Sequence, residues 1–193
     1  QLRLVAFPER VDPRDALVVR EPGATLNTLP PGARVGTGSV RRTALLRAFR
    51  PDLEIVAMRG NVPTRLRKLD EENLDAVVLA CAGLERLGMA DRIGERIESQ
   101  TLLPAVCQGA LALEACDGSE WAERMRELDD PETAIAVAAE RAFLSALEGD
   151  CSVPLAALCE VSSETEATLR GLVSSLDGTR VVRAERRLAR DVV

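Results

Sequence analysis

The chain has 193 residues, 46% of them hydrophobic and 29% charged, an ordinary globular composition with length for one large or two small domains. It has no histidine and no tyrosine, which excludes histidine-based acid–base catalysis and histidine metal sites and predicts a core of Ala, Val and Leu. The net charge of −6 argues against a nucleic-acid-binding surface, and no apolar run is long enough to cross a membrane.

The five cysteines indicate the redox state of the cellular compartment in which the protein is found. Their number is odd and no pair has the spacing of a metal or redox motif, which favours free thiols in a reducing cytosol. We expect a cytoplasmic monomer with no metal, no membrane anchor and no nucleic-acid partner. Because the chain starts with Gln1 in a strand-like run and stops at Val193, we also expect that both ends belong to a longer protein.

The first half of the chain alternates strand-like and helix-like segments. Strands are predicted at 2–7, 16–19, 34–36, 53–58 (a buried type) and 74–80, and helices at 39–49, 62–69 and 84–87. Residues 8–15 contain two prolines and suit a hinge. The strand–helix alternation after the hinge predicts a parallel sheet with right-handed crossovers.

The second half changes character after a further predicted strand at 110–115 and a helix at 120–128. A long alanine-rich helix is predicted at 132–147, with Asp130 as its N-cap and Pro131 in its first turn. Antiparallel strands are predicted at 153–161, 167–173 and 180–188, with a hairpin turn at Asp177-Gly178. The predicted fold is an α/β domain with a parallel-core sheet and a smaller α+β C-terminal domain.

Basic residues are concentrated between positions 34 and 68, which hold nine of them against two acidic residues. Three predicted strands end in this region or just after it, and ligands bind beyond the carboxyl ends of parallel strands. Glycines and hydroxyls follow the first strand end, and guanidinium groups follow all three. We expect these guanidinium groups to share one cleft and to bind a polyanion. They belong to Arg41, Arg42, Arg59, Arg65 and Arg86.

Any one of these arginines, taken alone, is better explained as part of a solvated helix face. We accept that explanation for Arg47, Arg50 and Arg67, and for the arginines between 180 and 190. The convergence of three strand ends favours ligand binding for the set. A phosphate ligand remains an alternative, because residues 36–39 resemble a general anion-binding loop, although they form no Walker A motif.

Two connections carry further candidates. Cys151 lies in a tight loop between the long helix and the next strand, where exposure favours reactivity, although a lone cysteine is usually a small buried hydrophobe. We apply that second explanation to Cys81, Cys107, Cys116 and Cys159. Gln108, in the connection 103–110, is expected to donate hydrogen bonds to a ligand, to lie in a plain hinge turn, or both.

Eight stretches resemble, in order and spacing, the porphobilinogen deaminases (hydroxymethylbilane synthases). They are 12–16 (DPRDA), 35–42 (VGTGSVRR), 58–66 (MRGNVPTRL), 75–80 (DAVVLA), 82–88 (AGLERLG), 103–110 (LPAVCQGA), 139–143 (AERAF) and 147–154 (LEGDCSVP). The resemblance covers nearly the whole chain. It implies a two-domain clamshell like the periplasmic binding proteins and a third, small α+β domain. The implied division is 1–14 (end of domain 1 and hinge), 15–103 (domain 2), 104–130 (return to domain 1) and 131–193 (incomplete domain 3).

The resemblance also implies a cofactor and an activity. A dipyrromethane would be attached to Cys151 by a thioether, and four porphobilinogens would be condensed, with loss of ammonia, into hydroxymethylbilane for haem, chlorophyll or corrin biosynthesis. The implied cofactor- and substrate-binding residues are Thr37, Ser39, Arg41, Arg42, Arg59, Gly60, Arg65, Arg86 and Gln108.

This sequence departs from the family pattern in three places. The segment with the family's catalytic aspartate is not matched, so we expect no turnover by this chain alone. Asp150 stands where glycine usually precedes the cofactor cysteine, and a carboxylate there should raise the pKa of the thiol. Gly38 stands where serine is common, a difference that we expect to be tolerated.

An alternative function is a non-catalytic clamshell protein that binds a small polycarboxylate or an oxyanion. Cys151 favours the transferase over this alternative, because a receptor needs no thiol in that loop.

Overall fold

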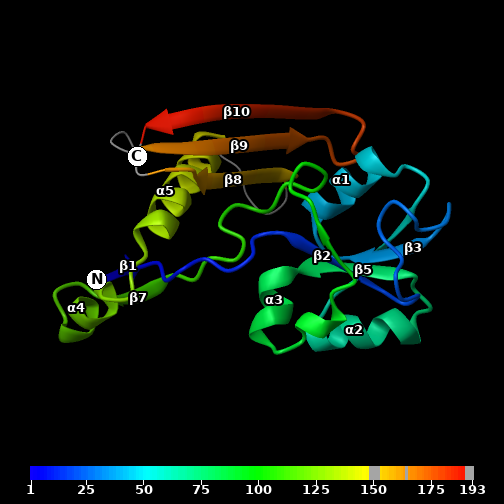
Figure 1. The fold of residues 1–193 in the computed structure, drawn as a ribbon, viewed down its shortest axis with the longest axis horizontal. Coiled ribbons are helices and arrows are strands. Elements are labelled where there is room, and N and C mark those ends of the chain that lie inside the picture. Colours follow the sequence, from blue (N-terminus) through cyan, green and yellow to red (C-terminus); the bar gives the residue numbers. More distant parts are fainter. Residues whose placement is uncertain (148–152, 164, 190–193) are drawn as a thin grey trace.

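The computed structural model describes residues 1–147, 153–163 and 165–189, which form three connected parts (Figure 1). The largest part is a five-stranded sheet with the order β4-β3-β5-β2-β6. Its strands are β2 (Asp15–Val19), β3 (Arg34–Thr37), β4 (Glu54–Ala57), β5 (Ala76–Ala80) and β6 (Glu95–Ile97). Its helices are α1 (Val40–Phe49), α2 (Val62–Glu71), α3 (Cys81–Arg86) and the short 3-10 helix η1 (Ala90–Arg92).

The parallel core of this sheet is confirmed, because β3 pairs in parallel with both β4 and β5. Strand β2 runs antiparallel to β5 and to β6, a strand that was not predicted. The strand predicted at 53–58 is present as β4, but the prediction that it is of a buried type is wrong, because β4 lies at the sheet edge and none of its residues is buried. An edge strand has one neighbour, so its apolar side chains are covered less completely than those of β5.

Alternate residues of the central strands face two separate cores, as the period of two in a strand requires. On one face Leu17 and Val78 pack with Leu45 and Leu46 of α1. On the other face the sheet packs against α2 and α3, through Leu66, Leu69 and Leu84. Both cores consist mainly of Ala, Val and Leu, as the composition predicted.

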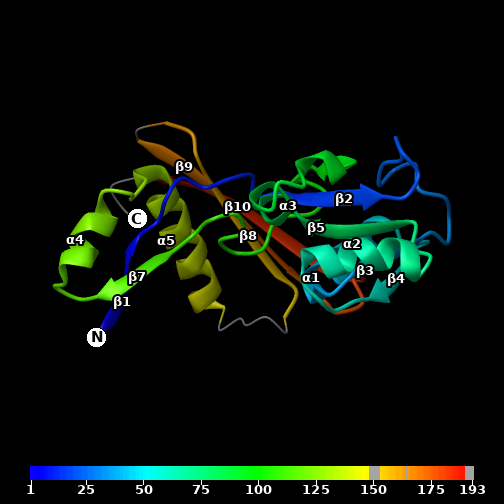
Figure 2. The same ribbon diagram turned by 90° about the horizontal axis from the view of Figure 1, so that it is seen from below.

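The second part consists of α5 (Pro131–Ala146) and an antiparallel sheet of β8 (Leu155–Val161), β9 (Glu166–Ser174) and β10 (Val181–Ala189), in the order β10-β9-β8. The predicted N-cap is confirmed, because Asp130 Oδ1 accepts a hydrogen bond from the Thr133 N–H at 2.8 Å. This sheet contributes Leu158 and Leu172 to the core on the α1 side of the first part. The two parts therefore share one hydrophobic core. Figure 2 shows the ribbon of the antiparallel sheet reaching from α5 to α1.

The third part is small: β1 (Leu2–Ala6) pairs antiparallel with β7 (Leu113–Cys116), and α4 (Glu120–Arg126) packs beside them. It leaves Leu2, Trp121 and Leu128 exposed. Two chain segments, around residues 7–14 and 104–112, connect it to the first part. They touch each other, since a Cβ at Gly109 would lie 2.6 Å from the Val11 carbonyl oxygen.

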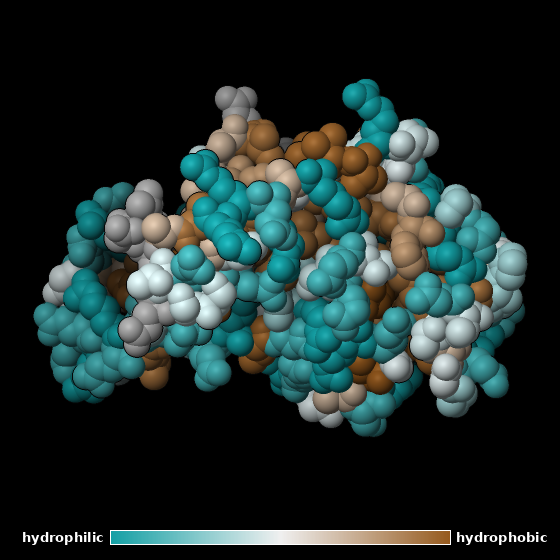
Figure 3. Space-filling model, turned by 45° about the horizontal axis from the view of Figure 1, so that its top comes forward, coloured by the Kyte–Doolittle hydropathy of each residue, from teal (hydrophilic) through white to brown (hydrophobic). Residues whose placement is uncertain are grey.

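The surface is mostly hydrophilic on the face that Figure 3 presents, with hydrophobic side chains in patches, most clearly at the top of the view. Among the described residues, no helix combines the length and the apolar character that crossing a membrane requires.

Candidate functional site

The loop between β3 and α1 packs against the end of β4. Ser39 is the N-cap of α1, where its Oγ accepts a hydrogen bond from the Arg42 N–H at 3.4 Å. Thr37 Oγ1 accepts one from the Ser39 N–H at 3.3 Å. A Cβ at Gly38 would lie only 2.4 Å from the Met58 carbonyl oxygen. Glycine therefore suits position 38 of this loop, whereas any side chain there would require the Met58 backbone to shift.

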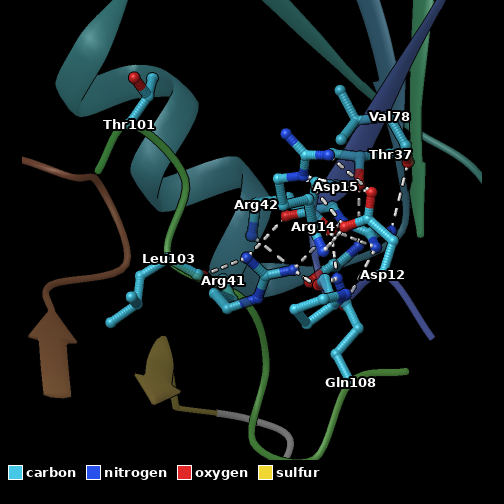
Figure 4. A network of polar contacts seen from close by, with 12 residues as sticks. Asp12, Arg14, Asp15, Thr37, Arg41, Arg42, Val78, Thr101, Leu103 and Gln108 are labelled. Carbon is cyan, nitrogen blue, oxygen red and sulfur yellow. Dashed lines mark hydrogen bonds and ion pairs between the residues drawn. The ribbon is translucent and has the colours of Figure 1, made fainter. Parts of the chain in front are cut away.

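A buried cluster of charges lies directly below this loop (Figure 4). Asp15 is completely buried, and Arg41 and Arg42 are 5% and 7% exposed. Arg42 donates from Nε and Nη2 to Asp15 Oδ1, at 3.0 and 2.7 Å. Arg41 donates from Nη2 to the same oxygen at 3.1 Å, and its Nη1 lies 2.8 Å from Asp15 Oδ2. One carboxylate thus neutralises part of the charge of two adjacent guanidinium groups.

Gln108 completes the cluster from the chain segment that returns to the third part. Its Nε2 donates to the Pro13 carbonyl oxygen at 2.6 Å and to Asp15 Oδ1 at 2.9 Å. Its Oε1 accepts from Arg41 and from Arg42 at 3.4 Å. Both amide hydrogens are committed within the protein, so Gln108 orients the charged cluster instead of donating to a ligand.

The electrostatics of the cluster follow from its burial. Burial opposes ionisation of Asp15, but Arg41 and Arg42 outweigh that effect and hold its pKa at about 2. Burial lowers the pKa of Arg41, although Asp15 opposes the shift. Asp15 is therefore a fixed negative charge at neutral pH. It was part of a motif in the sequence but was not predicted as a site residue.

One nitrogen in the cluster lacks a partner. Among the described residues, the buried Nε of Arg41 has no hydrogen-bond acceptor, which is costly for a charged group out of water. Arg41 also lines a cavity of about 240 Å³. The other lining residues are Ser39, Ala105, Val106, Leu144, Val153 and Leu155. The cavity thus combines apolar walls with one cation and one hydroxyl, which suits an apolar ring with a carboxylate.

The five arginines expected to share one cleft divide into two groups. Arg41 and Arg42 are buried, whereas Arg59 and Arg86 are exposed and Arg65 is half-buried. Arg65 Nε donates to the Gly60 carbonyl oxygen at 2.8 Å, and Arg86 Nη2 donates to that of Gly109 at 2.8 Å. Arg65 also lies near the 36–39 loop, since its Nη2 would be 3.6 Å from a Cβ at Gly38. Of the five arginines, only Arg41 is among the described residues that line the cavity.

A larger groove, of about 520 Å³, lies between α5 and the strands β9 and β10. Alanine, leucine and phenylalanine side chains form most of its lining, with Glu185 and Arg186 beside them. Among its described lining residues Arg186 is the one cation, so the groove is a poorer match than the smaller cavity for a polycarboxylate ligand.

Comparison with known proteins identifies the family. The family model described as "Porphobilinogen deaminase, dipyromethane cofactor binding domain" matches residues 1–124, and "Porphobilinogen deaminase, C-terminal domain" matches residues 134–192. The chain belongs to the porphobilinogen deaminase family. The resemblance inferred from the eight sequence stretches is therefore confirmed.

Curated porphobilinogen deaminases from several bacteria are similar to this chain. That of Roseiflexus sp. (strain RS-1) is 51% identical over 193 residues, covering 100% of this chain and 63% of the relative. That of Syntrophotalea carbinolica is 50% identical over 183 residues, covering 94% and 58%. That of Brevibacillus brevis is 48% identical over 177 residues, covering 91% and 57%. The chain thus spans about 60% of the length of these porphobilinogen deaminases.

The cysteine expected to carry the family's cofactor, Cys151, lies outside the described residues, as does Asp150 before it. Of the other four, Cys81 and Cys159 are buried as expected, and Cys107 is half-buried. The expectation for Cys116 is wrong, because the two-stranded ribbon of β1 and β7 leaves it exposed. Burial raises the pKa of the Cys81 thiol to about 12, and those of Cys107 and Cys159 to about 11.

Arg50 was expected on a solvated face, and this expectation is wrong. Its Nη1 donates to the Leu26 carbonyl oxygen at 2.7 Å and its Nη2 to that of Leu29 at 2.9 Å. It also pairs with Asp52. Arg50 therefore holds the loop before β3, whereas Arg47 and Arg67 are exposed as expected.

Sequence reasoning missed a second buried carboxylate, Glu140 of α5. Its two oxygens accept hydrogen bonds from Arg10 and from the backbone N–H groups of Cys107 and Cys159. The sequence did contain a signal, because Glu140 falls on the apolar side of the alanine-rich helix. In this member of the porphobilinogen deaminase family, Glu140 ties both connecting segments to β8.

Proposed function

We propose that this chain is the cofactor- and substrate-binding part of an enzyme that condenses four porphobilinogens into hydroxymethylbilane. Each addition would form a bond between the aminomethyl carbon of one porphobilinogen and the free pyrrole carbon of the growing chain, with loss of ammonia and of the proton on that carbon. The observation that carries this proposal is the unpartnered, buried Nε of Arg41 beside an apolar cavity, in a chain of this family.

The residues at the cavity fit a dipyrromethane, which consists of two linked pyrroles with acetate and propionate arms. Val106, Leu144 and Leu155 offer apolar walls for a ring, and Arg41 with Ser39 offers a polar end for a carboxylate. Cys151, the proposed attachment residue, stands two positions before Val153, which lines the same cavity. When bound, the group would supply the free pyrrole carbon to which substrate is added.

The remaining site residues are proposed to bind or position the ligand at different distances from the protein surface. Ser39 and Thr37 would orient a carboxylate through their hydroxyls, next to the start of α1. Arg59, Arg65 and Arg86 would bind carboxylates of the growing chain near the surface, where long side chains can follow a ligand that lengthens. Arg42 and Gln108 would hold Arg41 in place, and Gly60, with φ of +120°, would allow the turn between Arg59 and α2.

No acidic residue of this chain is proposed as the catalytic acid, because Asp15 is occupied by two arginines. We propose that the catalytic aspartate belongs to the part of the relatives that this chain does not match. We also propose the domain division 1–14, 15–103, 104–130 and 131–193, and a cytoplasmic monomer. Four unpaired cysteines among the described residues support the reducing compartment.

The test uses a chimera in which residues 1–193 replace the matching segment of the Roseiflexus relative. Purified from cells, the chimera should exceed its sequence mass by two pyrrole units and should consume porphobilinogen. Cys151→Ala should abolish both properties, whereas the control Cys116→Ala should keep them. A folded chimera with neither property would contradict the function, and an active chimera without added mass would contradict the cofactor.

A further inference from the structure

We infer that Asp15 is a positioning residue that sets the charge of the Arg41–Arg42 pair, so that the cluster accepts one ligand carboxylate, at Arg41. This inference deepens the proposed function and rests on it for the identity of the ligand. Asp15 itself would not touch the ligand, because it is completely buried beneath both arginines.

Both guanidinium groups of the cluster bind the Asp15 carboxylate. Each guanidinium nitrogen of Arg42 has an acceptor: Nε and Nη2 donate to Asp15, and Nη1 donates to the Val78 carbonyl oxygen at 3.2 Å. Arg41 pairs with the same carboxylate, because its Nη2 donates to Asp15 Oδ1 at 3.1 Å and its Nη1 lies 2.8 Å from Oδ2. Asp15 is therefore the shared counterion of both arginines, and one carboxylate leaves the pair with one uncompensated positive charge.

Arg41 is held through the two terminal nitrogens of its guanidinium group. Its Nη1 donates to the Leu103 carbonyl oxygen at 2.6 Å, and its Nη2 is shared by Asp15 and Gln108. These contacts fix the far end of the guanidinium group and leave Nε as its one donor without an acceptor among the described residues. A carboxylate that enters the cavity lined by Arg41 would supply the missing acceptor.

The net charge of the cluster limits which ligands it can bind. Two buried guanidinium groups and one ionised carboxylate leave one net positive charge. One carboxylate neutralises that charge, whereas a second negative charge would be buried without compensation, which is strongly unfavourable. The cluster should therefore prefer a monocarboxylate to a dianion, and this preference should follow its net charge.

The experiment compares two probes of known charge, pyrrole-2-carboxylate and sulfate, binding to this chain by calorimetry at constant ionic strength. The wild type should bind the monocarboxylate at least tenfold more tightly than sulfate. Asp15→Asn adds one net positive charge and should shift this ratio at least tenfold toward sulfate. Arg42→Gln removes the net charge of the cluster and should weaken the binding of both probes at least tenfold.

The double variant Asp15→Asn/Arg42→Gln restores one net positive charge and should recover the wild-type preference. A purely structural role of Asp15 would not produce this rescue. The matched control is Asp12→Asn, which removes a nearby carboxylate that pairs with Arg14 and Arg96 and should leave the ratio unchanged.

Several results would overturn the inference: no binding of either probe to the wild type, an unchanged ratio in folded Asp15→Asn, or a double variant that behaves like either single variant. If Asp15→Asn does not fold, Arg42→Gln and the double variant decide the question. Because neither probe is porphobilinogen, the result is independent of cofactor loading at Cys151. A failed chimera would therefore count against the proposed function without changing this measurement.

Discussion

Glu140 and Arg10, which are 130 positions apart in the sequence, form a buried ion pair with 2.6 Å between Oε1 and Nη1. The Glu140 side chain is 0% exposed and that of Arg10 10%. The same carboxylate accepts from the Cys159 N–H at 2.8 Å and from the Cys107 N–H at 2.5 Å. One side chain thus joins both connecting segments to the C-terminal sheet.

Replacing Glu140 by Gln should lower the free energy of unfolding by about 3–5 kcal/mol, because Arg10 would keep a buried charge without a counterion. Urea denaturation monitored by circular dichroism measures the loss. Glu120→Gln is the matched control: it breaks the exposed pair with Arg124 and should cost less than about 1 kcal/mol. Equal losses in the two variants would show that the Arg10 pair is not the source of stability.

The stability that Asp15 contributes should depend on pH in a defined range. Its pKa in the folded chain is about 2, below its usual value of 3.8, so the contribution is complete above about pH 4 and is lost as the pH falls toward 2. The expected size is about 2 kcal/mol. The difference in unfolding free energy between wild type and Asp15→Asn, measured from pH 5 to 2.5, should shrink over this range. A difference independent of pH would refute the prediction.

A side chain at Gly38 should be destabilising, because its Cβ would lie 2.4 Å from the Met58 carbonyl oxygen. Gly38→Ala should lower the free energy of unfolding by about 1–3 kcal/mol. Gly83→Ala provides the control, since its Cβ would meet Val62 at an ordinary 3.5 Å and it lies within a helix. That variant should be more stable by about 0.5–1 kcal/mol. A neutral Gly38→Ala would mean that the loop before α1 relaxes easily.

Cys116 should react with an alkylating reagent faster than Cys81, Cys107 and Cys159. Cys116 is exposed, whereas burial raises the pKa of Cys107 and Cys159 to about 11 and that of Cys81 to about 12. At pH 8 about one in a thousand thiols with a pKa of 11 is ionised, and the thiolate is the reacting form. Iodoacetamide followed by peptide mass mapping should label Cys116 at least tenfold faster. Labelling of Cys107 at the rate of Cys116 would contradict this.

The local pattern of the sequence was sufficient for the elements that depend on near neighbours. The N-cap Asp130 acts within one helical turn. The turn at Asp177-Gly178 was predicted from its own two residues, and Gly178 has the positive φ that glycine favours. The β–α–β–α–β unit and the strand ends that carry the site were predicted for the same reason. Strand β6 has only three residues, too few to show a period.

Partners distant in the sequence required the folded chain. The residues next to Arg41 in the sequence do not indicate that Asp15 and Gln108 bind it in the folded chain. Likewise, the sequence around Arg50 does not indicate that its guanidinium group binds the carbonyl oxygen of Leu26. Glu140 gains its role from Arg10 in the same way. A charge is stable in the interior only when a particular partner reaches it, and only the packing of distant segments brings that partner there.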